Sequence, residues 1–283
     1  MTDISTFDKL PNEIFHELFL YFNIRELYET FSRINIRFDL LIKNYNYLQV
    51  TANSINEMNH PVHRYYLSFT RRLITNHSKV FFDSDEHILT SVQCLILLQP
   101  SRDQWEAIQP IYFPSLQRLF LNNSTFIYKT KQLCQLIFSN QFSNLYQCEI
   151  PFVGYELNNQ WHFSPKLRSI EIKIWDIRIY EQILRCCSNL IRFKIELSGP
   201  NEQTNLTSNV QHFRLEYLKF RTLHSITYEQ IDSIVSLVPN LRHFILQATH
   251  YKQTSISLEQ LNRILKQRAH SLIHFNFNIR FYL

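Results

Sequence analysis

A short apolar pattern recurs through residues 92–283 of this chain. Each copy has an apolar residue, two variable residues, a second apolar residue, one variable residue and a third apolar residue. The eight copies are Val92-Leu95-Leu97, Leu116-Leu119-Leu121, Leu145-Cys148-Ile150, Leu167-Ile170-Ile172, Leu190-Phe193-Ile195, Leu215-Leu218-Phe220, Leu241-Phe244-Leu246 and Leu272-Phe275-Phe277. Their first residues are 22 to 31 positions apart. A fixed short period of this kind is typical of stacked structural repeats, so each copy predicts one short strand.

The segments between these strands carry apolar residues three to four positions apart, which is the spacing of a helix that buries one face. The clearest predicted helices cover 128–139, 176–187, 227–238 and 257–269. Breaks such as Phe113-Pro114-Ser115, Cys187-Ser188-Asn189 and Val238-Pro239-Asn240 separate helix from strand. A repeated strand, turn and helix predicts an α/β fold with parallel strands, in which helices cover the convex side.

Residues 7–41 have a different pattern, typical of three short helices. The helix predicted over 11–22 starts at Pro11, which suits a first helical turn, and it carries two apolar stripes where a surface helix normally has one. The stripes are Ile14, Leu18 and Tyr21, and Phe15, Phe19 and Phe22. Asn23 and Glu26 form a capping box for a second helix, and a third follows Asn35. Three short helices cannot bury this much apolar surface, which predicts a docking surface for another chain. The alternative is a simple cap that buries its own aromatic side chains.

The segment 46–91 is harder to interpret. Tyr45-Leu48-Val50 and Val62-Tyr65-Leu67 fit the strand pattern loosely, and Val80 to Phe82 is another candidate strand. Terminal repeats are often atypical because one of their faces has no neighbour. We therefore predict helices over 1–45, a linker or capping repeats over 46–91, and the repeats proper over 92–283.

Composition excludes several classes of protein. A hydrophobic fraction of 45% with 19% charged residues is that of a globular chain. There are only two glycines, Gly154 and Gly199, whereas phosphate-cradling loops need clustered glycine, so no nucleotide cofactor is expected. The longest apolar runs, such as Cys94 to Leu98, are too short to cross a membrane. No nucleophile and base are placed together by the pattern, so we expect no catalysis, no cofactor and no metal site.

The five cysteines lack metal-ligand spacing and no signal peptide is evident, which predicts reduced thiols and a cytoplasmic or nuclear location. The net charge of +5 is mild and the basic residues are dispersed. This favours a protein partner over nucleic acid, although nucleic-acid binding through a basic face stays an alternative.

Alternate residues of the predicted strands point away from the core, and in stacked repeats they line the concave side. Five cations there fall on three successive strands: Lys173, Arg192, Lys194, Lys219 and Arg221. With Tyr217 they form a candidate substrate-binding surface for an acidic or phosphorylated protein segment. The alternative is a solvated face that Glu171 and Glu196 neutralise.

The helical segment resembles the F-box family. Leu10-Pro11, Glu13, Ile14, Leu18-Phe19, Ile24 and Leu27 match its pattern, although Phe31, Ile34 and Phe38 stand where that family usually has Val-x-x-x-Trp. The resemblance implies a substrate receptor of an SCF-type ubiquitin ligase that docks on a Skp-type adaptor and, through it, on a cullin. The adaptor-binding residues would be Leu10, Pro11, Ile14, Phe15, Leu18, Phe19 and Leu27.

The repeats resemble the leucine-rich-repeat family, without its usual Asn or Cys at the ninth position. The two resemblances together imply an F-box followed by an irregular leucine-rich-repeat solenoid that binds the target protein. The alternative function is a leucine-rich-repeat scaffold unrelated to ubiquitination.

Overall fold

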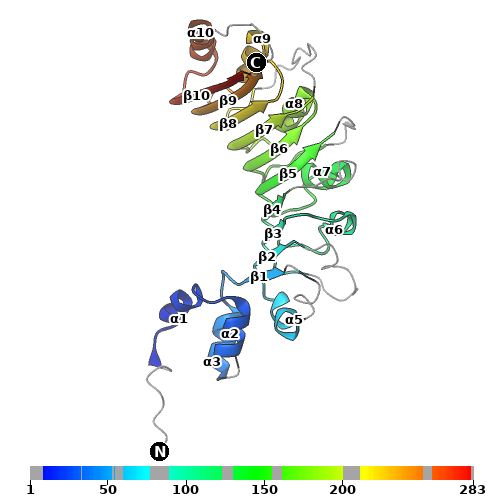
Figure 1. The fold of residues 1–283 in the computed structure, drawn as a ribbon, viewed down its shortest axis with the longest axis vertical. Helices are drawn as coiled ribbons and strands as arrows, with labels where there is room; N and C mark the ends of the chain where they lie inside the picture. The colour runs from blue at the N-terminus through cyan, green and yellow to red at the C-terminus, as the bar shows by residue number, and fades with distance from the viewer. Residues whose placement is uncertain are drawn as a thin grey trace, which may run out of the picture. The chain divides into compact units, whose positions relative to one another are not determined.

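The protein has an α/β fold with parallel strands, as the sequence predicts (Figure 1). The computed structural model describes residues 9–32, 34–52, 54, 60–76, 89–122, 130–154, 161–199, 211–250 and 257–281. The chain divides into two compact units, Met1–Leu116 and Gln117–Leu283. The divisions predicted after residues 45 and 91 both fall inside the first unit, because the helical segment packs on the elements that follow it.

The first unit begins with three helices, α1 (Asn12–Phe19), α2 (Ile24–Phe31) and α3 (Ile36–Lys43). The predicted capping box of α2 is confirmed: the Asn23 side chain accepts from the backbone N–H of Glu26, and the Glu26 carboxylate accepts from that of Asn23. Asn35 caps α3 in a similar way. Helix α1 ends three residues earlier than predicted, since its last turn is closed by short-range hydrogen bonds of the 3₁₀ type.

An aromatic cluster holds the three helices together. Phe15 meets Phe38 edge-to-face at 4.8 Å between ring centroids, and Phe19 meets Phe31 at 5.2 Å. Tyr45, just after α3, closes the cluster with a centroid 5.6 Å from that of Phe19. Such pairs contribute about 0.5–1.5 kcal/mol each beyond the area they bury. The helical segment therefore has a core of its own that extends past residue 43.

The rest of the first unit contains three parallel strands that pair in chain order, with two short helices between or after them. These elements are β1 (Gln49–Ala52), α5 (Pro61–Leu67), β2 (Arg72–Thr75), β3 (Cys94–Leu97) and α6 (Arg102–Ala107). Strands β1 and β3 follow the predicted pattern, whereas β2 and α6 were not predicted. The candidate strand Val80 to Phe82 lies outside the described residues.

The strand predicted over Val62 to Leu67 is wrong, because this segment is helix α5. Pro61 occupies the first helical turn, and the His60 imidazole accepts from the backbone N–H of Val62. Val62 and Tyr66, four positions apart, are both buried, which is helical spacing. The rings of Tyr65 and Tyr66 lie 6.2 and 6.0 Å from Tyr28 of α2, so α5 joins the repeats to the helical segment.

The second unit confirms the predicted repeat. Each of its strands starts two residues after the first apolar residue of a copy, and neighbouring strands run parallel in chain order (Figure 1). The strands are β4 (Arg118–Leu121), β5 (Gln147–Val153), β6 (Ser169–Ile174), β7 (Arg192–Leu197), β8 (Tyr217–Thr222), β9 (His243–His250) and β10 (His274–Phe281). The four predicted helices are also present, as α7 (Thr130–Phe138), α8 (Ile177–Cys186), α9 (Tyr228–Ser236) and α10 (Leu258–Arg268).

The apolar residues of the first seven copies are buried and form the core between strands and helices, whereas Leu272, Phe275 and Phe277 of the last copy are half-buried. Leu190, Phe193 and Ile195 of one copy are all buried. Tyr180 of α8 stacks on Phe193 with centroids 5.6 Å apart, and its hydroxyl donates to the carbonyl of Ile234 in α9 at 3.2 Å. The helices thus cover one face of the second unit's sheet, and the other face stays open to solvent.

Asparagine side chains tie successive turns together at a place the sequence analysis did not foresee. The Asn189 amide donates to the carbonyl of Pro165 at 2.7 Å, and the Asn240 amide donates to that of Phe213 at 2.9 Å. Both asparagines directly precede the first leucine of a copy, not the ninth position where the leucine-rich-repeat family has its Asn. They satisfy backbone carbonyls that the tight turns would otherwise leave without a partner.

Candidate interaction surfaces

The two apolar stripes of α1 differ in their exposure to solvent. Phe15 and Phe19 are buried, whereas Ile14 is 47% exposed and Tyr21, just beyond the helix, is 84% exposed. Leu18 between them is half-buried. Phe15 and Phe19 therefore build the helical core, and the stripe of Ile14, Leu18 and Tyr21 stays partly to largely accessible to solvent. We call it the exposed stripe of α1.

The seven residues predicted to bind an adaptor differ in the same way in their exposure to solvent. Phe15, Phe19 and Leu27 are buried, so they shape the docking surface only through the positions of their helices. Ile14 and Pro11 are exposed, and Leu10 and Leu18 are half-buried. Tyr21 was assigned to a stripe by its spacing but was not included among the predicted contacts, although it is the most exposed member.

Exposed apolar side chains concentrate in this part of the chain. Fifteen large apolar side chains are exposed among the described residues, and seven of them lie between residues 14 and 47. The seven are Ile14, Leu20, Tyr21, Ile34, Ile36, Leu40 and Tyr47. Contiguous exposed apolar surface marks interaction sites, whereas single exposed apolar residues do not.

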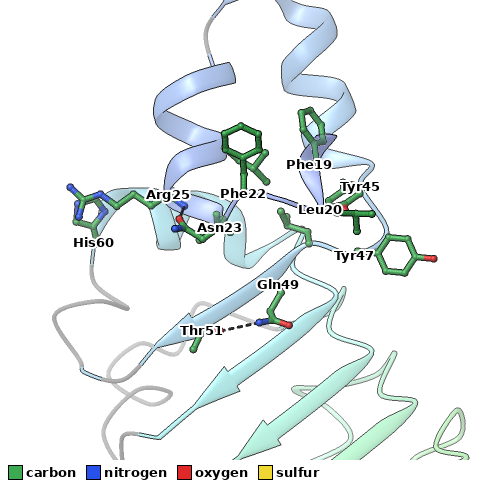
Figure 2. A pocket seen from close by; sticks show the side chains of 13 residues that line it. Phe19, Leu20, Phe22, Asn23, Arg25, Tyr45, Tyr47, Gln49, Thr51 and His60 are labelled. Carbon is green, nitrogen blue, oxygen red and sulfur yellow. Dashed lines mark hydrogen bonds between the residues drawn. The ribbon is translucent and has the colours of Figure 1, made fainter. Parts of the chain in front are cut away.

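A groove of about 670 Å³ lies where the end of α1 and the start of α2 meet β1, as Figure 2 shows. Phe19, Phe22 and Tyr45 form its apolar part, and Leu20 and Tyr47 are exposed beside it. Its lining is half polar, with Asn23, Arg25, Gln49, Thr51 and His60. The sequence analysis missed this groove, because it is made by residues that only the packing of the helices on β1 brings together.

The six residues of the predicted substrate-binding surface do lie on neighbouring strands. Strand register places Glu149, Glu171, Lys194 and Lys219 in one row across β5 to β8. A second row two residues further on contains Lys173, Glu196 and Arg221. We call these seven side chains the charged face, and several of them line a hollow of about 220 Å³. Arg192 lies two residues before Lys194 on β7, beside Tyr217 of β8. Its guanidinium carbon lies over the Tyr217 ring, 5.1 Å from the ring centroid.

Most cations of the charged face are paired. Lys194 Nζ lies 2.6 Å from Glu171 Oε2, and Lys173 Nζ lies 2.8 Å from Glu196 Oε1. Arg221 Nη1 lies 3.0 Å from Glu196 Oε2. The neutralisation by Glu171 and Glu196 that we gave as the alternative is therefore present. These pairs remain partly accessible to solvent, so they fix geometry more than they stabilise the fold.

Two charges on this face have no ion-pair partner in the described part of the chain: Glu149 at one end of the first row and Lys219 at the other. Partial burial, and then the nearby negative charge of Glu171, raise the pKa of Glu149, while Lys194 acts in the opposite direction. A cation placed beside Glu149 would stabilise its charged form and so oppose both effects. Glu149 could not be singled out from the sequence, because only strand register shows that Lys194 pairs with Glu171 and leaves Glu149 at the end of the row.

The cysteine side chains of the protein are shielded from solvent. All five cysteines are free and buried, and burial raises the pKa of Cys148 to about 12. No three His, Cys, Asp or Glu side chains come together as metal ligands in the ranges that the structure describes. None of the described helices is long and apolar enough to span a membrane.

No protein-family model matches this chain, and no curated protein is significantly similar to it in sequence.

Proposed function

We propose that this protein is the substrate-recognition subunit of an SCF-type ubiquitin ligase. In this proposal α1 to α3 act as a divergent F-box that binds a Skp-type adaptor, and through it a cullin. The parallel repeats act as a divergent leucine-rich-repeat solenoid that binds the protein to be ubiquitinated.

The observation that carries the proposal is the exposed stripe of α1. A three-helix segment with a complete aromatic core has no internal need for exposed Ile14 and Tyr21. Each such side chain gives up the roughly 1.5–3 kcal/mol that full burial of a large apolar group provides. A partner that covers the stripe with an apolar groove recovers part of this free energy, as amphipathic helices do in groove-type complexes.

The chain itself would make and break no bond. A receptor accelerates ubiquitin transfer by holding a lysine of its target near the conjugating enzyme, which raises the effective concentration of the reacting groups. This requires only two binding surfaces on one chain, and the described residues offer two: the exposed stripe of α1 and the charged face.

The test is capture of partners from cell extract by the tagged full-length chain, identified by mass spectrometry. The wild type should recover a Skp-type adaptor with a cullin. Ile14→Asp with Tyr21→Asp should lose both while remaining folded, since both positions are exposed. Ile273→Asp is the matched control, because Ile273 is 76% exposed and lies in the second unit.

Phe19→Asp is unsuitable for this test, since it would place a charge in the helical core and unfold it. Recovery of the same partners by the wild type and the Ile14/Tyr21 variant would refute docking through the stripe. A folded wild type that recovers no adaptor would favour the other function, an interaction scaffold outside any ubiquitin ligase.

A further inference from the structure

The charged face is bipolar. Along its first row the order of charges is Glu149 and Glu171, then Lys194 and Lys219. Glu171 and Lys194 in the middle neutralise each other at 2.6 Å. Among the described residues, the Glu149 carboxylate on β5 and the Lys219 ammonium group on β8 are left without an ion-pair partner.

The distance between these two ends follows from the sheet. Strands β5 and β8 are three strand spacings apart, and adjacent strands lie about 4.8 Å apart, so the two ends are separated by about 14 Å. An extended peptide advances about 3.3 Å per residue. Side chains about four residues apart on such a peptide would therefore reach both ends.

The basic end can accept a strong anion without disrupting the rest of the face. Lys219 and Arg221 are two positions apart on β8 and so point to the same side. Glu196 holds Lys173 through one oxygen and Arg221 through the other. If Arg221 turned to an incoming anion, Lys173 would keep Glu196 neutralised.

We propose that the charged face binds an extended protein segment with two opposite charges about four residues apart. A Lys or Arg of the segment would face Glu149, and an Asp, Glu or phosphorylated residue would face Lys219 and Arg221. The inference rests on the proposed receptor function, whose target it describes. Nucleic acid fits this face poorly, because its phosphates would meet Glu149 and Glu171 and it offers no cation for them.

The probes are fluorescent 12-residue peptides on a neutral polar background. Each carries one Arg and one phosphoserine separated by two, four, six or eight positions, in both orders, and further peptides carry only one of the two charges. Fluorescence polarisation with the full-length chain should show tightest binding at a separation of about four. The singly charged peptides should bind about tenfold more weakly.

Variants that remove one charge of the face show which end binds which charge of the peptide. Glu149→Gln should weaken binding only of peptides that carry Arg, and Lys219→Gln should weaken binding only of peptides that carry phosphoserine. Both positions are partly solvent-accessible, so neither change should alter folding. Glu259→Gln is the control, since Glu259 is an exposed carboxylate on α10.

The inference is overturned if the phosphoserine-only peptides bind as tightly as the bipolar ones, if separation has no effect, or if no peptide binds. Preference for a polynucleotide with steep salt dependence would also overturn it. Capture of a Skp-type adaptor, measured with the same preparations of the full-length chain, tests the receptor proposal independently of the proposal of a bipolar segment. Adaptor recovery without peptide binding rejects only the bipolar segment, and peptide binding without adaptor recovery rejects only the ligase role.

Discussion

Replacement of Asn189 by alanine tests how the repeats are tied to one another. The Asn189 side chain joins three successive copies of the repeat: its amide donates to the Pro165 carbonyl at 2.7 Å, and its oxygen accepts from Arg214 Nη1 at 2.6 Å. In a stack of repeats, each repeat depends on its interfaces with neighbours, so loss of such a link lowers the stability of the whole stack.

The expected cost follows from the exposure of the two bonds. The partly buried bond to Pro165 contributes about 0.5–1.5 kcal/mol, since its loss leaves a carbonyl without a partner. The bond from Arg214 is exposed and contributes about 0–1 kcal/mol. Asn189→Ala should therefore lower the free energy of unfolding by about 1–2 kcal/mol. Arg214→Met should account for the smaller part, and Asn240→Ala, which removes one exposed bond, should cost less than Asn189→Ala.

Urea unfolding of the full-length chain, followed by tryptophan fluorescence, measures these differences. Two of the three tryptophans, Trp161 and Trp175, lie in the second unit. With a slope of about 2–3 kcal/mol per molar urea, Asn189→Ala should move the midpoint down by about 0.5 M. An unchanged midpoint, or equal losses for Asn189→Ala and Asn240→Ala, would refute the reasoning from burial.

Three further predictions concern backbone approach, thiols and pH. Gly199→Ala should cost about 1–3 kcal/mol in thermal unfolding, because an added Cβ would lie 2.0 Å from the Trp175 carbonyl oxygen; an unchanged Tm would contradict the close approach. None of the five buried cysteines should react with a thiol reagent at pH 7.5 in the folded protein, since burial keeps thiols such as Cys148 protonated, and all five should react in denaturant; fast labelling before unfolding would be the opposite result. His212 donates from Nε2 to the Cys187 carbonyl at 2.8 Å, and burial lowers its pKa below the usual 6.5. The unfolded state then binds the proton more readily than the folded state. The stability that neutral His212 contributes above pH 6.5 should therefore be lost as the pH falls below 6.5. In a plot of urea midpoint against pH, His212→Gln should make this decline shallower.

The repeats were predictable because their signal is redundant. Every strand of the second unit repeats the spacing seen in Leu190, Phe193 and Ile195, and such a fixed period is the sequence signature of stacked repeats. The starts of α2 and α8 were equally clear, since Asn23 and Asp176 cap them, whereas the cap of α6 at Ser101 was overlooked.

The wrong predictions of secondary structure came where one short apolar spacing fits both a helix and a strand. Val62, Tyr65 and Leu67 satisfy a strand pattern, yet Pro61 and the His60 cap start a helix there. Strand β2 (Arg72–Thr75) has Thr70 and Thr75 where most copies have apolar residues, so the pattern does not show it. Local patterns of this length do not decide between helix and strand, and tertiary packing does.

The sequence predicted that an apolar and a charged surface exist, but not which of their residues are exposed or paired. Spacing alone gave the two stripes of α1, but it did not reveal that the stripe with Phe15 and Phe19 faces inward, because that depends on Phe38 and Tyr45 from other elements. Likewise the cations on β6 to β8 followed from alternation. Their pairing depended on strand register, which leaves Glu149 and Lys219 without an ion-pair partner in the part of the chain that the structure describes.

The most direct test of the central proposal is calorimetric titration of the purified full-length chain with a purified Skp-type adaptor. We expect a one-to-one complex whose formation has a negative heat-capacity change, since the exposed stripe of α1 would be buried. Ile14→Asp with Tyr21→Asp should abolish binding, and Ile273→Asp should leave it unchanged. No binding by the folded wild type, or equal binding by the wild type and the Ile14/Tyr21 variant, would contradict the account.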